Sequence, residues 1–261
     1  MNRQRHSPLV AVPAAVAFAF VALPLVGVAV RMPWSGAWDL VTAPAVRQAG
    51  WISLVTSVTA AGVSAMVGVP LGWWLARTEG RLVGVVRSVV VTPMILPPVV
   101  AGIALLSVLG RRGIIGAQLL EWWGVTIPFT RTAVVMAQVF VSLPFLVLAV
   151  ESSFHQLDRG LEDAARTLGA SPWRVFSTVA LPGARSAVAA GTVLAWARSL
   201  GEFGASITFA GSFPGRTQTL PMSIYELVST DYPSAMAVSF VMMAVSVAVI
   251  GSLRGRWMVA R

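Results

Sequence analysis

The sequence has no cysteine and no lysine among its 261 residues, and only two histidines. The absence of cysteine excludes disulfide frameworks, cysteine-ligated zinc, iron–sulfur clusters and thiol catalysis. Two histidines, His6 and His155, are too few to build a metal site alone, and we expect His155 to be a solvent-facing loop residue. The pattern GxxxxGK followed by Ser or Thr, which binds nucleotide phosphates, is also missing.

Charge is scarce as well. Only 11% of the residues are charged, whereas 56% are hydrophobic and the mean hydropathy is +0.78. These values are typical of an integral membrane protein rather than of a soluble domain. All 19 basic residues are arginines and the net charge is +9. Because the arginines fall in short flanks of apolar runs, they indicate membrane topology rather than nucleic-acid binding.

Six apolar runs are each near the length that crosses a bilayer as a helix. They cover residues 9–30, 52–76, 88–109, 132–150, 186–210 and 235–253. The first run is too long for the core of a secretory signal peptide, so we expect it to be a retained span. No fixed-period repeat or second soluble domain is visible. The sequence predicts an all-α membrane protein, with one domain over residues 1–261.

Arginine placement predicts the orientation of these spans. With the N-terminus inside, twelve arginines lie on inner flanks and six on outer flanks. We therefore expect both termini to be cytoplasmic in a multi-pass protein of the bacterial plasma membrane. The outer loop 110–131 carries three arginines among apolar residues, which suits a short amphipathic helix in the outer interface.

Under this topology residues 151–185 form the longest cytoplasmic loop, with a pattern typical of helix, turn and helix. Residues 157–168 are good helix formers, and Gly169 can take the left-handed conformation that ends a helix. Ser171 followed by Pro172 favours the start of a second helix. From the residues alone, a solvated connecting loop and a docking element for another protein remain equal alternatives.

The loop resembles the EAA signature of permease subunits of ABC importers. Asp163-Ala164-Ala165 is followed after three residues by Gly169, and then at the family spacing by Val179 and Leu181-Pro182. Asp163 stands where the consensus has Glu, with Glu162 directly before it, and Val179 replaces Ile. The resemblance implies a type I permease fold whose loop carries a coupling helix. That helix would dock on a separate cytoplasmic ATPase, which binds ATP and Mg, so this chain would hold no cofactor and would not be an enzyme. The residues assigned to this contact are Glu162, Asp163, Ala164, Ala165, Gly169, Ala170, Pro172, Trp173, Leu181 and Pro182.

Arg198 and Glu202 are ionisable residues inside the fifth apolar run. Because they are four residues apart, we expect them to pair on one helical face. Two interpretations stay open: an ion pair that locks the bundle, or a pair on the translocation path. Prolines inside the third run predict a kink that can shape a gate. The residues assigned to this path or gate are Arg198, Gly201, Glu202, Gly204, Pro97 and Pro98.

Three further segments resemble the molybdate/tungstate and sulfate permease group of these importers. They are "LPPVVAG" at 96–102, "SLPFLV" at 142–147 and "ARSLGEFGAS" at 197–206, so the likeness runs from about residue 50 to 225. It implies alternating-access import of a tetrahedral oxyanion, with molybdate or tungstate favoured over sulfate or thiosulfate. It also implies an extracytoplasmic binding protein and a second permease copy as partners, besides membrane lipid. An ion-gradient transporter and a membrane scaffold are the alternatives from other classes.

Overall fold

The computed structural model describes residues 8–257, and within this range the chain forms helices and connecting turns without strands. The predicted all-α class is confirmed. Arg3, Arg5, His6 and Arg261, which entered the sequence predictions, lie outside the described residues. The helices are α1 (Pro8–Arg31), α2 (Ala37–Thr42), α3 (Pro44–Arg77), α4 (Arg81–Val91), η1 (Thr92–Met94), α5 (Pro98–Leu109), α6 (Gly116–Trp123), α7 (Arg131–Gln156), α8 (Arg159–Thr167), α9 (Pro172–Val175), the π-helix η2 (Phe176–Ala180), α10 (Leu181–Gly183), α11 (Arg185–Leu200), α12 (Gly204–Ala210), α13 (Leu220–Thr230) and α14 (Tyr232–Trp257).

Among the described residues, four helices are long and apolar enough to cross a bilayer, namely α1, α3, α7 and α14. Two bent helix pairs raise this number to six if each pair is one crossing. In the first pair, α4 and η1 meet α5 at 118°, and in the second, α9 and α10 meet α11 at 80°.

Two of the six apolar runs, 88–109 and 186–210, are interrupted by helix breaks, the first of them where the sequence predicts a kink. The first breaks at residues 95–97, where Pro97 has ψ 135° because a residue that precedes a proline is driven out of the helical region. The second ends at Leu200, and residues 204–210 form the separate helix α12. Pro144, by contrast, lies inside the continuous helix α7.

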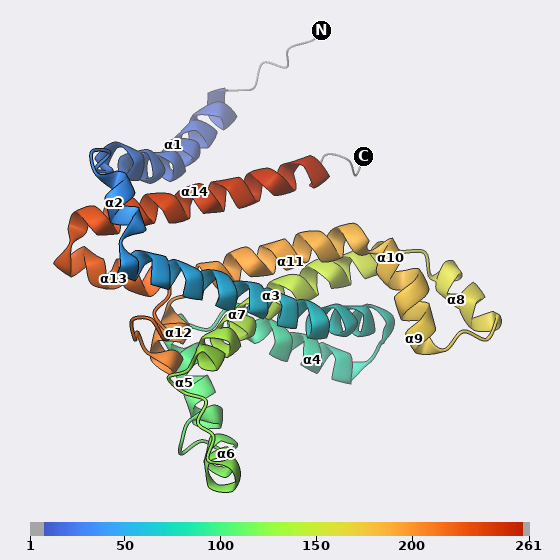
Figure 1. The fold of residues 1–261 in the computed structure, drawn as a ribbon. Helices are drawn as coiled ribbons and strands as arrows, with labels where there is room; N and C mark the ends of the chain where they lie inside the picture. Colours follow the sequence, from blue (N-terminus) through green and yellow to red (C-terminus); the bar gives the residue numbers. More distant parts are fainter. Residues whose placement is uncertain (1–7, 258–261) are drawn as a thin grey trace.

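The core of the molecule is made by α3, α7 and α11, which run side by side (Figure 1). Their close approach depends on glycines that leave no room for a side chain. A Cβ on Gly72 would lie 2.4 Å from Val150, and one on Gly191 would lie 2.8 Å from Leu146. Small residues at such contacts let helix backbones approach closely in membrane proteins.

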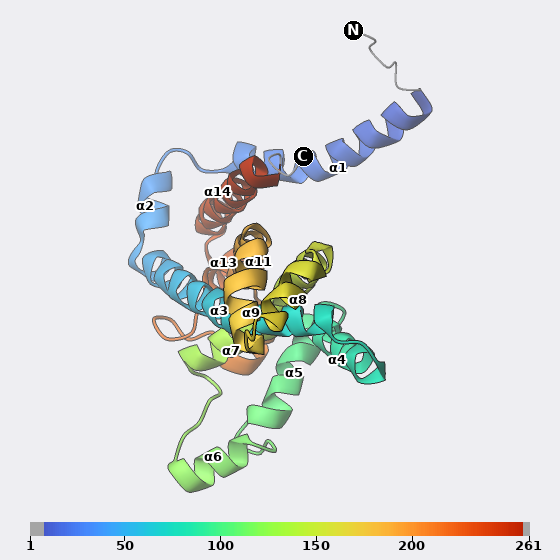
Figure 2. The same ribbon diagram turned by 90° about the vertical axis from the view of Figure 1, so that its right-hand side faces the viewer.

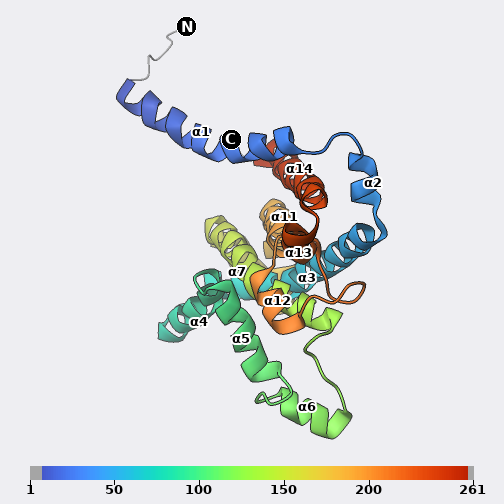
Figure 3. The same cartoon turned by 90° about the vertical axis from the view of Figure 1, so that its left-hand side faces the viewer.

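The remaining elements gather at the two ends of this core. Helices α8 and α9 lie at one end, and α2, α12 and α13 lie toward the other (Figure 1). Helices α5 and α6 project away from the core, and α1 extends in a different direction (Figures 2 and 3). Helix α6 is the short helix expected within residues 110–131, and its Trp122 and Trp123 are exposed.

Candidate functional site

The segment between α7 and α11 folds as two short helices joined by a tight turn. Asp158 caps α8 by accepting a hydrogen bond from the Gly160 N–H at 2.9 Å, so α8 begins at Arg159. Gly169 ends the helix with φ 85°, and its N–H donates to the Arg166 carbonyl. The Ala170 N–H donates to the Ala165 carbonyl, which completes a Schellman motif. The predicted turn at Gly169 is confirmed.

The second helix begins as its sequence predicts. Ser171 accepts a hydrogen bond from the Arg174 N–H at 3.3 Å, and Pro172 occupies the first helical position. From this start the chain stays helical through α9 and η2 and into α10, which begins with Leu181 and Pro182. Leu181 is half-buried against the core, whereas Pro182 is exposed.

The outer side of this loop exposes large apolar side chains. Leu161, Leu168 and Trp173 are all exposed, and Trp173 is one of the residues that the motif assigns to the ATPase contact. Around the turn a shallow pocket is lined by Ala165, Leu168, Gly169, Ala170, Arg174 and Thr178. Leu161, Leu168 and Arg174 were missed by the motif comparison, because the motif does not specify them. The sequence signal that could have found them is an apolar or basic residue within a segment that is otherwise polar.

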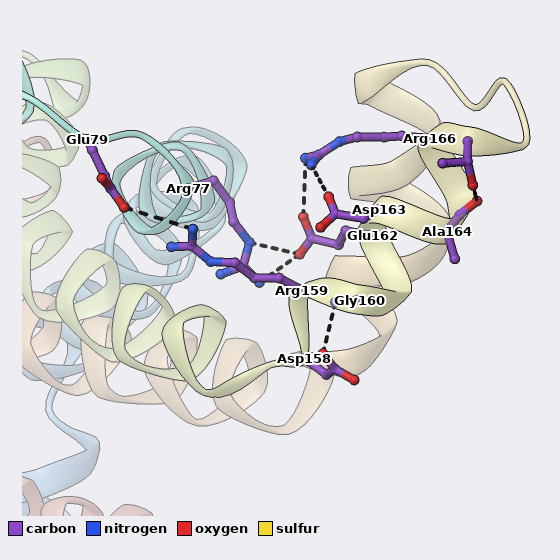
Figure 4. Close-up of polar contacts among 10 residues, drawn as sticks. Arg77, Glu79, Asp158, Arg159, Gly160, Glu162, Asp163, Ala164 and Arg166 are labelled. Atoms are coloured by element: carbon purple, nitrogen blue, oxygen red, sulfur yellow. Dashed lines mark hydrogen bonds and ion pairs between the residues drawn. The ribbon is translucent and has the colours of Figure 1, made fainter.

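Glu162, which the motif assigns to the contact, does not lie on that exposed surface. Its side chain is only 2% exposed and accepts hydrogen bonds at Oε1 from Arg77 Nε at 2.9 Å and Arg77 Nη2 at 2.7 Å. Oε2 lies 3.5 Å from Arg166 Nη2. The neighbouring Asp163 is 65% exposed, and Figure 4 shows its carboxylate beside the same Arg166, its only ion-pair partner in the described region. Successive helical residues differ by about 100° in direction, so Glu162 is buried against α3 while the adjacent Asp163 stays exposed to solvent.

Ala164 and Ala165 follow Asp163 on α8. Ala164 is exposed and Ala165 is half-buried. Their small side chains leave the backbone of α8 open to close approach from outside.

An aromatic stack anchors the second half of the loop. Phe176 is buried, with its ring 5.1 Å from Trp73 of α3 and 5.5 Å from Trp173. Phe176 packs in the core against residues of α3, α7 and α11.

A second ion pair lies close to the start of the loop. Arg87 of α4 donates through Nε to Oε1 of Glu151 on α7 at 2.9 Å. His155, one turn later, is half exposed and its Nε2 lies 3.7 Å from the same oxygen. Within residues 8–257 no group of three or more His, Asp or Glu side chains could hold a metal ion.

Toward the other end of the core, Arg198 and Glu202 pair as expected but not on one helix. Arg198 lies in the last turn of α11, whereas Glu202 follows the end of that helix. Arg198 Nη1 is 2.8 Å from Glu202 Oε2, and Glu202 Oε1 accepts a hydrogen bond from the Ala205 N–H at 2.8 Å. The buried carboxylate of Glu202 therefore joins α11 to the N-terminus of α12, where the helix dipole favours negative charge.

Of the prolines and glycines assigned to the gate, Gly204 and Pro98 are in contact at this break. A Cβ on Gly204 would lie 2.4 Å from Pro98 Cβ, so α12 packs directly on the first turn of α5. Gly201 has open space around it and ends α11. Pro97 precedes α5 as its extended N-cap residue.

Comparison with known proteins is consistent with this geometry. A family model described as "Binding-protein-dependent transport system inner membrane component" matches residues 68–260. The chain is 45% identical over 238 residues to the "Molybdenum transport system permease protein ModB" of Mycobacterium tuberculosis, covering 91% of this chain and 90% of that protein. It is 32% identical to the "Sulfate transport system permease protein CysT" of Escherichia coli, over 85% of this chain and 80% of that protein.

Among solved structures, a bacterial ABC transporter involved in the import of alginate has a similar fold. The TM-score is 0.71, with 16% identity over 97% of this chain and 95% of that chain. At this identity the likeness concerns the fold alone.

Proposed function

This chain belongs to the family of binding-protein-dependent transport system inner membrane components, and from that premise we propose that it is the permease of an ATP-driven molybdate importer. The observation that carries the proposal is the likeness to a molybdenum permease along nine-tenths of the chain. Tungstate shares the tetrahedral geometry and charge of molybdate and belongs to the same proposed class of cargo.

The loop between α7 and α11 is the proposed docking site for the ATPase. The whole sequence has no phosphate-binding loop of the GxxxxGK type, so a separate subunit has to hydrolyse the ATP. Exposed Leu161, Leu168 and Trp173 beside Asp163 and Arg174 give an apolar centre with a charged rim, as protein interfaces commonly have. The arginine distribution supports a cytosolic position for this end and for both termini.

The break between α11 and α12 is the proposed position of the path and its gate. The Arg198 side chain is 32% exposed, so its charge can attract an anion while Glu202 holds it in place. Because Gly204 packs on Pro98, a shift of α12 also moves α5. Alternating access would open and close the path by such movements of packed elements.

Two further partners complete the proposal. An extracytoplasmic binding protein delivers the anion, which the name of the matched family supports. A second copy of this chain completes the pore, so that two coupling loops face two ATPase subunits. No candidate partner is a nucleic acid.

Sulfate is the second candidate cargo because a sulfate permease is 32% identical over 85% of this chain. Molybdate and sulfate are both tetrahedral dianions, and we expect the binding protein to make most of the selection between them.

Reconstitution tests the proposal. The chain is placed in liposomes with its ATPase and binding protein, and radiolabelled molybdate uptake is followed with ATP inside the vesicles, on the ATPase side. We expect uptake that requires both ATP and the ATPase, with excess sulfate competing weakly. Uptake driven by an ion gradient without ATP would refute the ATP-driven importer. Strong competition by sulfate would instead favour sulfate over molybdate as the cargo.

A further inference from the structure

We infer that Trp73, Arg77, Glu162 and Phe176 form a clamp, here called the α3 clamp, that transmits movement of the docking loop into α3. This inference rests on the proposed function and deepens it, because it assigns positioning residues that the family motif does not specify. These residues do not touch the cargo or ATP. Their proposed task is to make the loop and α3 move as one body.

The ion pair in the clamp is buried and doubly hydrogen-bonded. Arg77 is the last residue of α3, its side chain is only 9% exposed, and both Nε and Nη2 donate to one oxygen of Glu162 (Figure 4). Charge-assisted contacts of this geometry are shorter and stronger than neutral ones. Removal of one partner from a buried pair leaves an uncompensated charge, so the contact cannot be lost without consequence.

A third contact strengthens the connection between α8 and the end of α3. Arg159, the first residue of α8, donates through Nη2 to the Ala76 carbonyl at 3.3 Å. Cationic side chains are favoured at this end of a helix, where backbone carbonyls are unpaired. The first turn of α8 is therefore held against α3 at two positions, Arg159 and Glu162.

The aromatic part of the clamp attaches the other half of the loop to the same face of α3. Trp73 lies four residues before Arg77, so the two side chains share one side of the helix. Trp73 contacts Phe176 in η2, whereas Arg77 contacts Glu162 in α8. Both arms of the loop are thus fixed to one helix, and a push on the exposed side of either arm reaches α3.

Helix α3 leads from the clamp to the opposite end of the molecule. Its 34 residues span about 50 Å, and it packs along both α7 and α11. Ser57 of α3 accepts a hydrogen bond from Trp196 Nε1 at 3.0 Å, and Ser53 accepts one from the Leu220 N–H at 2.7 Å. A displacement at Arg77 therefore reaches α11, which carries Arg198, and the start of α13.

Adjacent acids on α8 consequently have different tasks. Asp163 is exposed and accessible to the proposed ATPase, whereas Glu162 is buried against Arg77 of α3. Loss of the exposed acid should weaken ATPase association. Loss of the buried acid should leave association intact and uncouple ATP hydrolysis from transport.

The test measures molybdate uptake per ATP hydrolysed in the full reconstituted complex with Glu162→Gln. We expect the ATPase to co-purify as with the wild type, and the ratio of uptake to hydrolysis to fall about tenfold, within the usual range of coupling between sites. Glu79→Gln is the matched control, since Glu79 carries the same charge close to the end of α3 but is 88% exposed and lies 4.0 Å from Arg159. Its ratio should equal that of the wild type.

A cross-linked variant separates a lost link from a damaged fold. Because the chain has no native cysteine, Arg77→Cys combined with Glu162→Cys provides two unique thiols in the permease. We expect the double variant to be uncoupled and a flexible bis-maleimide bridge between the thiols to restore at least half of the wild-type ratio. A bridged permease that remains uncoupled would overturn the inference.

Two other outcomes have separate meanings. A wild-type ratio of uptake to hydrolysis in Glu162→Gln, or loss of the ATPase from that variant, would overturn the clamp while the importer stands. Failure of the wild-type chain to bind any ATPase would instead refute the proposed function.

Discussion

Gly169 shows how one residue fixes the shape of the loop between α7 and α11, the proposed docking site for the ATPase. Its φ of 85° belongs to the left-handed region, and its N–H is engaged with the Arg166 carbonyl. A Cβ built on Gly169 meets nothing within 4 Å, so only the backbone limits substitution. For a residue with a side chain this conformation costs about 1–2 kcal/mol, and the cost is lowest for asparagine.

The effect of a substitution at Gly169 should therefore depend on the backbone conformation that the new residue allows, and not on the size of its side chain. We expect Gly169→Asn to retain ATPase association and Gly169→Ala to reduce it slightly. Gly169→Pro should abolish it, because proline fixes φ near −65° and removes the donor N–H. Co-purification with a tagged ATPase measures the effect, with membrane insertion checked for each variant. Full retention of the ATPase by Gly169→Pro would refute the proposed docking role.

Arg198 and Arg216 form a matched pair of arginines for testing the path. Arg198 is bound to buried Glu202 at the break between α11 and α12, whereas Arg216 is exposed in the loop before α13. We expect Arg198→Ala to lower uptake by at least tenfold, because it removes the proposed anion attraction and leaves Glu202 as an uncompensated buried charge. Arg216→Ala should reduce uptake much less. Equal uptake by the two variants would contradict a path role for Arg198.

At the scale of elements, the sequence indicated the helices better than their breaks. Apolar runs of about twenty residues predict where a chain can cross a membrane, and α1, α3, α7 and α14 lie over four of these runs. The 118° bend before α5 exceeds the kink that Pro97 and Pro98 suggested. The break at residues 201–203 has no proline, and it depends on Glu202 capping α12 and on Gly204 packing against Pro98.

The loop between α7 and α11, the proposed docking site, also has side-chain directions that the sequence did not predict. The turn at Gly169 and the caps at Asp158 and Ser171 are local features, and the sequence predicted the turn at Gly169 and the helix start at Ser171. The inward direction of Glu162 depends on where Arg77 lies, 85 residues earlier in the chain. Contacts of such long range are set by tertiary packing, which a local motif does not contain.

Two neighbouring glycines test the contact between α12 and α5. Gly204→Ala places a methyl group 2.4 Å from Pro98 Cβ, and we expect it to destabilise the permease by about 1–3 kcal/mol through overpacking. Gly201→Ala is the control, since the nearest atom to its new Cβ is the Ala197 carbonyl oxygen at 3.9 Å. Thermal unfolding of the purified permease measures both. An unfolding temperature for Gly204→Ala equal to that of Gly201→Ala would show that the packing can relax.

At the scale of the whole molecule, a single copy of the chain does not fully bury one charged side chain of the apolar helix α11. Arg198 is partly exposed although it lies in an apolar helix, and exposure of an arginine to lipid costs at least about 2.5–3.5 kcal/mol near mid-bilayer. A second copy of the chain, enclosing a water-filled path between the two, would remove this cost. The break between α11 and α12 then lies at the interface of two permeases.

Stoichiometry tests this arrangement directly. Native mass spectrometry of the purified complex should give two copies of this chain with two ATPase subunits and no second kind of permease. Gly201→Cys, exposed at the break in a chain without native cysteine, should also cross-link two copies with a short thiol reagent. Gly62→Cys, on the exposed side of α3, serves as the control and should cross-link poorly. A complex that pairs this chain with a different permease would contradict the homodimer.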